Sequence, residues 1–378
     1  MIPFNLPSIT KLEEKYIIDA LSSQLCGDGK YTKKATILLS RILQANNLLL
    51  TTSCSHALEL AALTLPLQKD EEVILPSFTF VSTANAFLLR GLKPVFCEIE
   101  PETFNMDTTK IENCMSEKTR AIVPVHYAGV SCNMDKVNEI AKKYGLFVIE
   151  DAAQALGSKY KGRTCGTLSD IGCFSFHETK NIVMGEGGAA VFSNSELRKR
   201  AEILREKGTN RTQFFRGEVD KYTWHMIGSS YLPSDILTAI LTAQLERFDE
   251  IQNRRMQCWK IYYDSFEQLE DGGYLKRPYI PPYAEHNAHI FYLVLNTENE
   301  RDRMLQYLKQ NEIQAVFHYI PLHSAPMGLQ MGYCASDLPV TEAFAQRMIR
   351  LPLWADISHE QIETVIQKVY NFFMKRES

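Results

Sequence analysis

The stretch SFHETKNIVMGEGGAAVF (residues 175–192) joins two strand-like apolar runs and places one lysine between them. Lys180 follows an aromatic run and comes shortly before three glycines, at positions 185, 187 and 188. A lysine in such a loop is either an ordinary surface residue or an amine held in a pocket because it forms a covalent bond with a ligand. The strands and motifs on either side decide between these interpretations.

Size and composition limit what the chain can be. With 378 residues it is longer than most single domains, so we expect two units. A net charge of −4 disfavours nucleic acid as a partner. The N-terminus lacks the apolar run of a signal peptide, and no window has the roughly 18 apolar residues of a membrane span. The nine cysteines contain no CxxC pair, which indicates neither a zinc site nor a disulfide framework. We therefore expect a cytoplasmic protein that binds no metal, nucleic acid or membrane.

Apolar runs alternate with helical patterns up to about residue 245. The runs are β-branched or aromatic and mostly continuous, as in strands that are covered on both faces. They occupy residues 47–53, 71–78, 93–100, 120–129, 146–153, 171–177 and 188–194. Between them lie amphipathic helices such as residues 134–145, which end in a glycine. The alternation predicts an α/β fold whose large domain, residues 1–245, is built on a mostly parallel sheet.

A long helical pattern, residues 234–269, leads out of this large domain, and its length predicts a bend or a break. Beyond it the pattern predicts a strand, a helix and a second strand, at residues 289–297, 302–312 and 315–321. A last helix is expected after Ser358, whose spacing to Gln361 fits a capping box. Residues 246–378 thus form a smaller C-terminal α/β domain in this interpretation.

The motif EDAAQ (150–154) ends one of the predicted strands. On an open α/β sheet, ligands gather at the carboxyl ends of the strands. The carboxylate of Asp151 could there hold a positively charged nitrogen of a ligand. Aspartate also commonly caps a helix that follows it, and the motif alone leaves both interpretations open.

Two further motifs lie at predicted strand ends. In TTSCSHAL (51–58), small hydroxyl residues stand where a helix begins, and backbone N–H groups at such a position bind phosphate, although a serine there can also be a simple cap. In PSFTFVSTANA (76–86), Phe80 lies in a turn, where its ring can stack on a planar ligand or pack in the core. Neither GxGxxG nor GxxxxGK[ST] is present, which disfavours an NAD-dependent oxidoreductase and a Walker phosphate loop.

A lysine amine, a carboxylate, a stacking ring and a phosphate site together describe a site for pyridoxal 5′-phosphate (PLP). The order of the motifs TSCSHAL, PSFTFVSTANA, EDAAQ, SFHETKN and GEGGA resembles the DegT/DnrJ/EryC1/StrS sugar aminotransferases. The resemblance runs from residue 27 to residue 323, essentially the whole chain. It implies the fold of PLP-dependent transferases of fold type I, like that of aspartate aminotransferase, and amino transfer to a nucleotide-linked keto sugar.

The resemblance also implies roles for individual residues. Lys180 would bind the cofactor covalently and move the proton, and Asp151 would pair with the pyridinium nitrogen. Gln154 would contact the side of the ring that carries the phenolic oxygen, and Phe80 would stack on the ring. The phosphate would be held by three residues near strand ends, Cys54, Ser55 and Ser175.

One position departs from the family pattern. Many members have an asparagine that reaches the phosphate in the neighbouring subunit of a homodimer with a shared active site. This chain has Ser230 in that place, within Gly-Ser-Ser-Tyr-Leu (228–232). Serine is shorter and offers a single donor, so the contact across the dimer is in question.

The substrate is predicted from a segment outside the cofactor motifs. Residues 205–224 and 228–232 resemble the branch of the family that makes dTDP-4-amino-4,6-dideoxy-D-galactose from a dTDP-4-keto-6-deoxy sugar, with L-glutamate as the amino donor. Arg211, Tyr319 and His323 are the candidate substrate residues, although each can also be an ordinary surface or packed residue.

Several alternatives stay open at this point. A related enzyme could act at C3 of the sugar or give the gluco product at C4. A protein of another class could bind PLP without catalysis and act as a regulator, but it would have no need of both Lys180 and Asp151. Relatives that dehydrate sugars carry histidine in place of the lysine, so Lys180 favours amino transfer.

Overall fold

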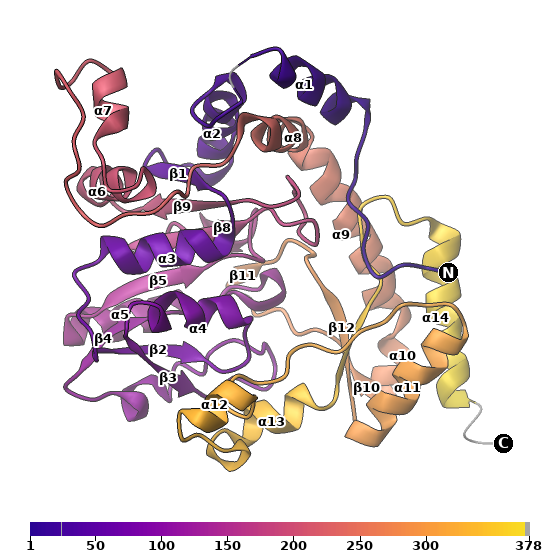
Figure 1. The fold of residues 1–378 in the computed structure, drawn as a ribbon. Coiled ribbons are helices and arrows are strands. Elements are labelled where there is room, and N and C mark those ends of the chain that lie inside the picture. The colour runs from indigo at the N-terminus through magenta and orange to yellow at the C-terminus, as the bar shows by residue number, and fades with distance from the viewer. Residues whose placement is uncertain (24, 375–378) are drawn as a thin grey trace.

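The computed structural model describes residues 1–23 and 25–374. Its centre is a seven-stranded sheet in the order β1-β9-β8-β5-β4-β2-β3 (Figure 1). The strands are β1 (Leu48–Thr51), β2 (Glu72–Pro76), β3 (Lys93–Cys97), β4 (Thr119–Ile122), β5 (Phe147–Asp151), β8 (Ile171–Ser175) and β9 (Gly188–Phe192). Only β9 runs against its neighbours β1 and β8, and the other neighbouring pairs are parallel. The predicted mostly parallel sheet is confirmed.

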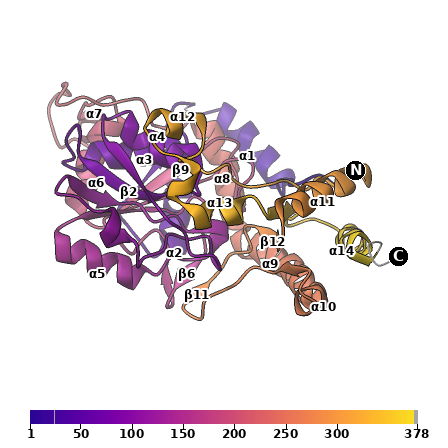
Figure 2. The same cartoon turned by 90° about the horizontal axis from the view of Figure 1, so that it is seen from below.

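Helices cover both faces of this sheet, which explains the continuous apolar runs. One face packs against α2 (Lys30–Leu43), α5 (Met134–Tyr144) and α8 (Asp235–Glu246). The other face packs against α3 (Cys54–Thr64), α4 (Val81–Leu88) and α6 (Ser195–Arg205), and Figure 2 shows α3 and α4 on the side opposite to α5. Along β2, Val73 and Leu75 belong to one core while Ile74 belongs to the other, so every position of the strand is apolar.

Beyond α8 the chain forms another hydrophobic core, separate from the packing on the two faces of the central sheet, which we call the second core. The predicted long helix breaks twice, at Arg247 and Phe266, into α8, α9 (Phe248–Ser265) and α10 (Glu267–Asp271). The second core is formed by α9, α11 (Glu298–Gln310) and α14 (His359–Met374) with the antiparallel sheet β10 (Leu275–Lys276), β12 (Phe291–Leu295) and β13 (Met348–Leu351). We keep 245/246 as the proposed domain boundary, with residues 375–378 outside the described residues.

The helix α14 begins as predicted. Ser358 Oγ accepts the backbone N–H of Gln361 at 3.2 Å, and the side chain of Gln361 accepts the N–H of Ser358 at 3.0 Å. These two bonds are the capping box that the spacing of the two residues indicated.

The strand predicted at residues 315–321 is wrong. Val316 forms one isolated antiparallel bridge with Arg350, and the chain then leaves the small sheet. Leu322 donates its N–H to the carbonyl of Ser77 at 3.0 Å, so the segment crosses from the second core to the end of β2. Because the segment leaves the small sheet to reach the end of β2, it forms too few ladder hydrogen bonds to be a strand, although its residues are apolar.

The remaining elements are short and connect these layers. They are α1 (Lys11–Leu21), α7 (Arg211–Phe215), α12 (Pro326–Gln330), α13 (Pro339–Ala345), the 3₁₀ turns at Ile111–Cys114, Tyr127–Gly129 and Ala335–Asp337, and a small sheet of β11 (Ala284–Glu285), β6 (Lys159–Tyr160) and β7 (Arg163–Thr164). In the part of the chain that the structure describes, no helix combines the length and apolarity needed to cross a bilayer.

One long loop, residues 206–230, stands out from the body of the molecule and carries α7 (Figure 1). Its two ends are joined, because Glu206 and Ser230 form an antiparallel bridge and Lys207 donates its N–H to the carbonyl of Ser229 at 2.9 Å. The loop exposes apolar side chains, including Trp224 (76% exposed) and Ile227 (79% exposed).

Candidate active site

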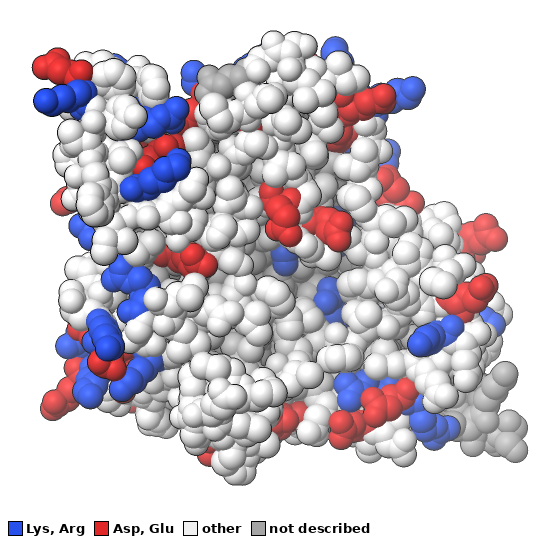
Figure 3. Space-filling model, in the orientation of Figure 1, with Lys and Arg blue, Asp and Glu red and all other residues white. Residues whose placement is uncertain are grey.

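A cavity of about 540 Å³ opens at the edge of the sheet where β1, β8 and β5 end. Figure 3 shows this hollow in the middle of the face, with basic side chains inside it. Ligands collect at this edge of an open α/β sheet because the strand ends and the loops after them point into one space. Eight of the predicted site residues line the cavity: Cys54, Ser55, Phe80, Asp151, Gln154, Ser175, Lys180 and Tyr319.

Lys180 stands in a tight loop between β8 and β9. Its N–H bonds to the carbonyl of His177 at 2.9 Å, and Glu178 donates to the carbonyl of Gly185 at 3.0 Å. Gly185 has a φ of +82°, a conformation that favours glycine. Burial lowers the pKa of the Lys180 amine, and the charge of Arg350 lowers it further, while Cys54 and Asp151 act in the opposite direction. A lysine with a lowered pKa has more of the neutral amine, the form that bonds to a carbonyl carbon and accepts protons.

Asp151 is the last residue of β5 and is buried. Its carboxylate accepts the hydroxyl of Thr83 at 2.7 Å and the N–H of Ala153 at 3.1 Å, and it has no ion pair in the described residues. Burial raises the pKa of this carboxyl group. The residues after it form turns rather than a helix, so the helix-capping interpretation does not hold. A buried carboxylate without a cation is suited to a positively charged ligand nitrogen.

The start of α3 forms an anion site beside this carboxylate. Ser53 caps the helix by accepting the N–H of His56 at 3.1 Å, so Cys54 and Ser55 are the first helical residues, whose N–H groups have no partner inside the helix. Burial raises the pKa of the Cys54 thiol, which keeps it uncharged next to an anion. Close packing requires one residue of the glycine cluster to lack a side chain. A Cβ at position 188 would lie only 2.5 Å from the Ser53 carbonyl carbon, which is too close for any other residue than Gly188.

Aromatic and amide groups form the remaining walls. Phe80 precedes α4 and is 57% exposed, whereas Phe78 two residues earlier is fully buried against Phe104 and Tyr127. The Phe80 ring is therefore free to stack on a planar ligand. Gln154 accepts the N–H of Ala128 at 2.7 Å and donates its amide to the Tyr319 hydroxyl at 3.2 Å, which fixes its orientation at the cavity wall.

Three predicted site residues lie elsewhere. Ser230 and Arg211 belong to the long loop and do not line the cavity of their own chain, and Arg211 faces Glu206 at 3.6 Å. His323 is fully buried outside the cavity lining, where Ser77 contacts its Nδ1 at 2.7 Å and Glu342 lies 3.4 Å from its Nε2. His323 packs the crossing segment onto β2, so it is not carried further as a sugar contact.

Sequence reasoning missed Arg350, which reaches the cavity from β13. Its guanidinium lies over the ring of Phe4 at 4.5 Å and has no carboxylate partner among residues 1–23 and 25–374, and its Nε is buried without a hydrogen bond. Burial lowers its pKa. The sequence did contain a sign of this residue, because a charged residue stands between Ile349 and Leu351 in an otherwise apolar run, but no motif linked it to Lys180. His289 and His318 were missed or passed over in the same way and also line the cavity.

The residues present fit PLP. Lys180 offers an amine with a lowered pKa, Asp151 a buried carboxylate without a cation, and α3 a helix start whose first N–H groups are free for a phosphate. The exposed ring of Phe80 lies on the same cavity. PLP, when bound, supplies the electron sink that lets a carbon next to nitrogen lose a proton.

Comparison with known proteins agrees with this geometry. GDP-perosamine synthase of Escherichia coli O157:H7 is 31% identical to this chain and covers 98% of both sequences. Helicobacter pylori PseC, an aminotransferase involved in the biosynthesis of pseudoaminic acid, superposes with a TM-score of 0.91 at 26% identity over 99% of both chains. Spr1654 of Streptococcus pneumoniae, described as a sugar aminotransferase and solved in its PLP form, superposes with a TM-score of 0.91 at 27% identity over 99% of both chains. The model of the DegT/DnrJ/EryC1/StrS aminotransferase family matches residues 7–370, and the chain therefore belongs to this family of PLP-dependent sugar aminotransferases.

Proposed function

We propose that this chain moves the amino group of L-glutamate to C4 of dTDP-4-keto-6-deoxy-D-glucose, giving dTDP-4-amino-4,6-dideoxy-D-galactose for surface polysaccharide synthesis in the cytoplasm. The observation that carries the choice of sugar is the sequence of residues 205–232, which resembles family members with that activity. Cofactor residues look alike whatever the sugar, so only segments outside them can distinguish substrates.

The free guanidinium of Arg350 supports an amino donor that carries a carboxylate. Among the described residues no acidic side chain pairs with it, although it shares the cavity with Lys180. A buried cation without a partner is costly, and a bound anion removes that cost. The start of α3 is the site for the cofactor phosphate, so Arg350 is left for the substrate, and the fork of its guanidinium matches a carboxylate.

In this proposal Lys180 and Asp151 divide the chemistry. The Nζ of Lys180 takes the proton from Cα of glutamate and, in the second half of the reaction, delivers a proton to C4 of the sugar. Its lowered pKa keeps it in the neutral form that can accept a proton. The carboxylate of Asp151 holds a proton on the ring nitrogen, and the face of the sugar that meets Nζ decides between the galacto and gluco products.

The long loop supports a homodimer with a shared active site. It carries three exposed apolar side chains, Phe215, Trp224 and Ile227, which a monomer would leave in water. Arg211 and Ser230 lie on the same loop and away from their own cavity. In a dimer that buries this loop, Ser230 would reach the cofactor phosphate of the partner subunit, and Arg211 would meet the nucleotide diphosphate.

A second candidate substrate is a GDP-linked 4-keto sugar. It is favoured by the relatives named GDP-perosamine synthase, which cover 82 to 99% of this chain at 28 to 32% identity. Amino transfer at C3, the gluco product at C4 and PLP binding without catalysis are the remaining alternatives. The presence of both Lys180 and Asp151 in one cavity speaks against the last of these alternatives.

One experiment separates these candidates. The purified holoenzyme is incubated with L-glutamate and, in parallel, with dTDP-4-keto-6-deoxyglucose, its 3-keto isomer and a GDP-linked 4-keto-6-deoxy sugar. We expect the dTDP-4-keto sugar to react on the order of 100-fold faster than the 3-keto isomer, because a shift of about 1 Å in the reacting carbon costs that much. Proton coupling constants should show an axial amine at C4. An equatorial C4 amine, a C3 amine or a faster GDP-sugar reaction would contradict the proposed substrate.

A further inference from the structure

His289 is a cavity residue to which the proposed function assigns no role. It lies just before β12, is 6% exposed and shares the cavity with Lys180 and Arg350. Burial, with the positive charges of Lys180, Arg255 and Arg350, holds the pKa of its imidazole well below the usual range. His318, on the same cavity, is held neutral for the same reasons. His289 is therefore uncharged, and the question is which of its two ring nitrogens carries the proton.

The neighbour of the catalytic lysine answers this question. Asn181 donates its Nδ2 to the carbonyl oxygen of Asn287 at 2.8 Å and to Gln252 Oε1 at 3.3 Å. A backbone carbonyl can only accept, so this edge of the Asn181 amide must be the NH₂ group. The opposite edge, Oδ1, lies 2.9 Å from His289 Nδ1. Because an amide oxygen cannot donate, Nδ1 of His289 must carry the proton.

The segment that presents His289 is itself held firmly. Asn287 donates its side-chain amide to the carbonyls of Gln154 and Leu156, both at 2.9 Å, and its Oδ1 accepts the N–H of His289 at 3.1 Å. Gly129 lies so close that a Cβ there would be 1.9 Å from Asn287 Oδ1. The loop after Asp151 and the loop with Lys180 are thus fastened to one short segment, residues 287–289.

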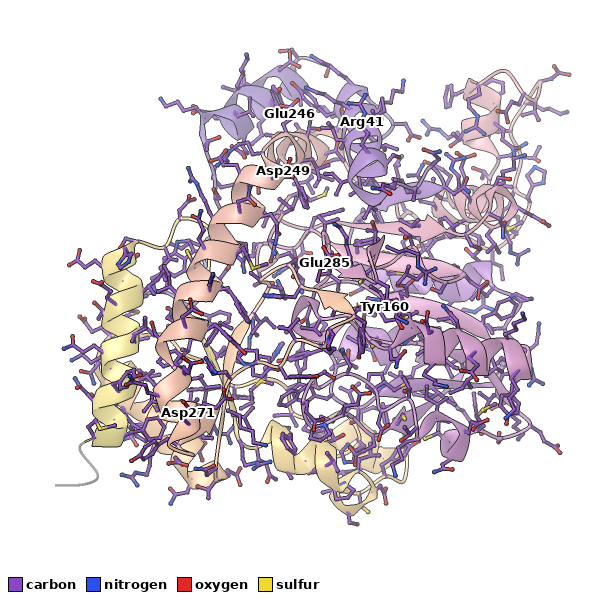
Figure 4. The ribbon with its side chains drawn as sticks, turned by 180° about the vertical axis from the view of Figure 1, so that it is seen from behind. Arg41, Tyr160, Glu246, Asp249, Asp271 and Glu285 are labelled. Carbon is purple, nitrogen blue, oxygen red and sulfur yellow. The ribbon has the colours of Figure 1, made fainter. Side chains whose placement is uncertain are left out.

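The pairing of β11 with β6 anchors the same segment from the other side. Ala284 stands opposite Tyr160, and Glu285 stands opposite Lys159, whose Nζ it meets at 3.2 Å. Figure 4 shows Tyr160 and Glu285 next to each other at this pairing, viewed from behind the molecule. Because the hydrogen bonds of Asn287 fix residues 287–289 on one side and the pairing of β11 with β6 fixes the chain before them, the ring of His289 has a defined position relative to Lys180.

We propose that Asn181 is a positioning residue that fixes His289 as the neutral tautomer with the proton on Nδ1, so that Nε2 serves as a hydrogen-bond acceptor in the cavity beside Lys180. Nε2 has no hydrogen-bond partner among residues 1–23 and 25–374. It accepts an N–H or O–H of the bound substrate, while Arg350 takes the carboxylate. The inference rests on the proposed aminotransferase site for the identity of that substrate, but the tautomer can be measured without any ligand.

The direct test is nitrogen NMR of ¹⁵N-histidine-labelled apo protein, with the His289 signals assigned by their loss in His289→Gln. We expect Nδ1 protonated and Nε2 unprotonated throughout roughly pH 5 to 8, the range in which ordinary histidines titrate. A proton on Nε2, or a charged ring at neutral pH, would overturn the proposal. This result is independent of which sugar the enzyme uses, so it can fail while the proposed function stands.

Two variants of Asn181 test the positioning role. Asn181→Asp places a carboxylate against Nδ1–H, so we expect His289 to bind a second proton within the same pH range. Asn181→Ser removes the fixed amide oxygen, and we expect signals from both tautomers. The matched control, Asn138→Asp on α5, makes the same charge change at a residue that bonds to the Leu168 carbonyl, and should leave His289 unchanged. An unchanged ring in both Asn181 variants would show that Asn181 does not set the tautomer.

The acceptor role is tested in the half-reaction of the holoenzyme with L-glutamate. His289→Gln keeps an acceptor oxygen near the position of Nε2, whereas His289→Phe keeps the bulk and removes the acceptor. We expect the Phe variant to react about tenfold more slowly than the Gln variant, the effect of one hydrogen bond. Equal rates of the two variants would contradict an acceptor function for Nε2.

Discussion

The hydroxyl of Thr83 donates to the carboxylate of Asp151 at 2.7 Å and thereby ties α4 to the end of β5. This bond holds the carboxylate in place and favours its charged form, against the burial that raises its pKa. We therefore expect the charge of Asp151, rather than its hydrogen bond to the turn after β5, to be what the reaction requires.

Asp151→Asn is the test of that statement. The amide keeps the size and can still accept the N–H of Ala153, so we expect an unchanged fold but a collapse of turnover. If Asp151 only stabilised the turn, activity would survive with a stability change of at most about 1 kcal/mol. Thr83→Val, the milder change, should slow turnover by roughly tenfold through loss of one hydrogen bond to a charged group. Full activity of Asp151→Asn would refute the pairing with a ring nitrogen.

Lys180 should be the residue that binds PLP covalently. Borohydride reduction of the holoenzyme makes that bond permanent, and peptide mapping should then find the cofactor on Lys180. Lys180→Ala should lose the visible absorbance of the bound form and all turnover, while Lys207→Ala on the long loop should keep the absorbance. Cofactor found on any other lysine would contradict the assignment of Lys180 as the PLP-binding residue.

The parts of the site that could be predicted lie at strand ends in the first half of the chain. Lys180, Asp151 and Cys54 each follow an apolar run, and the carboxyl ends of parallel strands meet at one edge, so local patterns sufficed. Arg350 and His289 come from the second core, and only the three-dimensional packing brings them to Lys180. His323 was named as a candidate substrate residue, but the crossing segment places its ring against Ser77 and outside the cavity lining.

Arg350→Gln tests the site for the amino donor. The change removes the positive charge that we assign to the carboxylate of glutamate, and a hydrogen bond to a charged group is worth about 1.5–3 kcal/mol. We expect KM for L-glutamate to rise roughly 10- to 150-fold, with a smaller effect on the keto sugar. Arg347→Gln is the control, because Arg347 lies over Phe344 and does not line the cavity. A larger effect on the sugar would place the diphosphate, not the donor, at Arg350.

Ser230→Ala should weaken PLP binding about tenfold or more, if the serine reaches the phosphate across a dimer. Equilibrium titration of apo protein with PLP measures the change, and Ser229→Ala serves as the neighbouring control. An unchanged affinity would mean that this position no longer has the role of the asparagine it replaces.

The stability of the apo protein should depend on pH through Lys180. Because the folded pKa is lowered, the unfolded chain binds more protons than the folded one between that value and the ordinary lysine pKa of 10.5. Stability linked to Lys180 is therefore lowest below the folded pKa and rises as the pH climbs through this window. Lys180→Met should raise the urea midpoint of the apo protein at neutral pH, by an amount that shrinks at high pH. The control Lys118→Met, at an exposed lysine, should leave the urea midpoint unchanged. A lower midpoint for Lys180→Met would contradict the predicted sign.

The long loop closes on itself where it leaves the body of the molecule, through the bridge between Glu206 and Ser230. The part between these residues is also attached to the body of the molecule, because Arg216 binds both carboxylate oxygens of Glu202 on α6 at 2.9 Å and Met226 packs against the core beside α6. Among the described residues, only the exposed stretches of the loop, around Phe215 and Trp224, are free of such contacts with α6, and we expect these stretches to tolerate changes in length or composition. If these stretches contact the nucleotide sugar, as we propose, substrate choice can diverge among relatives while the chemistry at the strand ends stays constant, and grafting residues 207–229 from a relative should redirect the enzyme to another sugar.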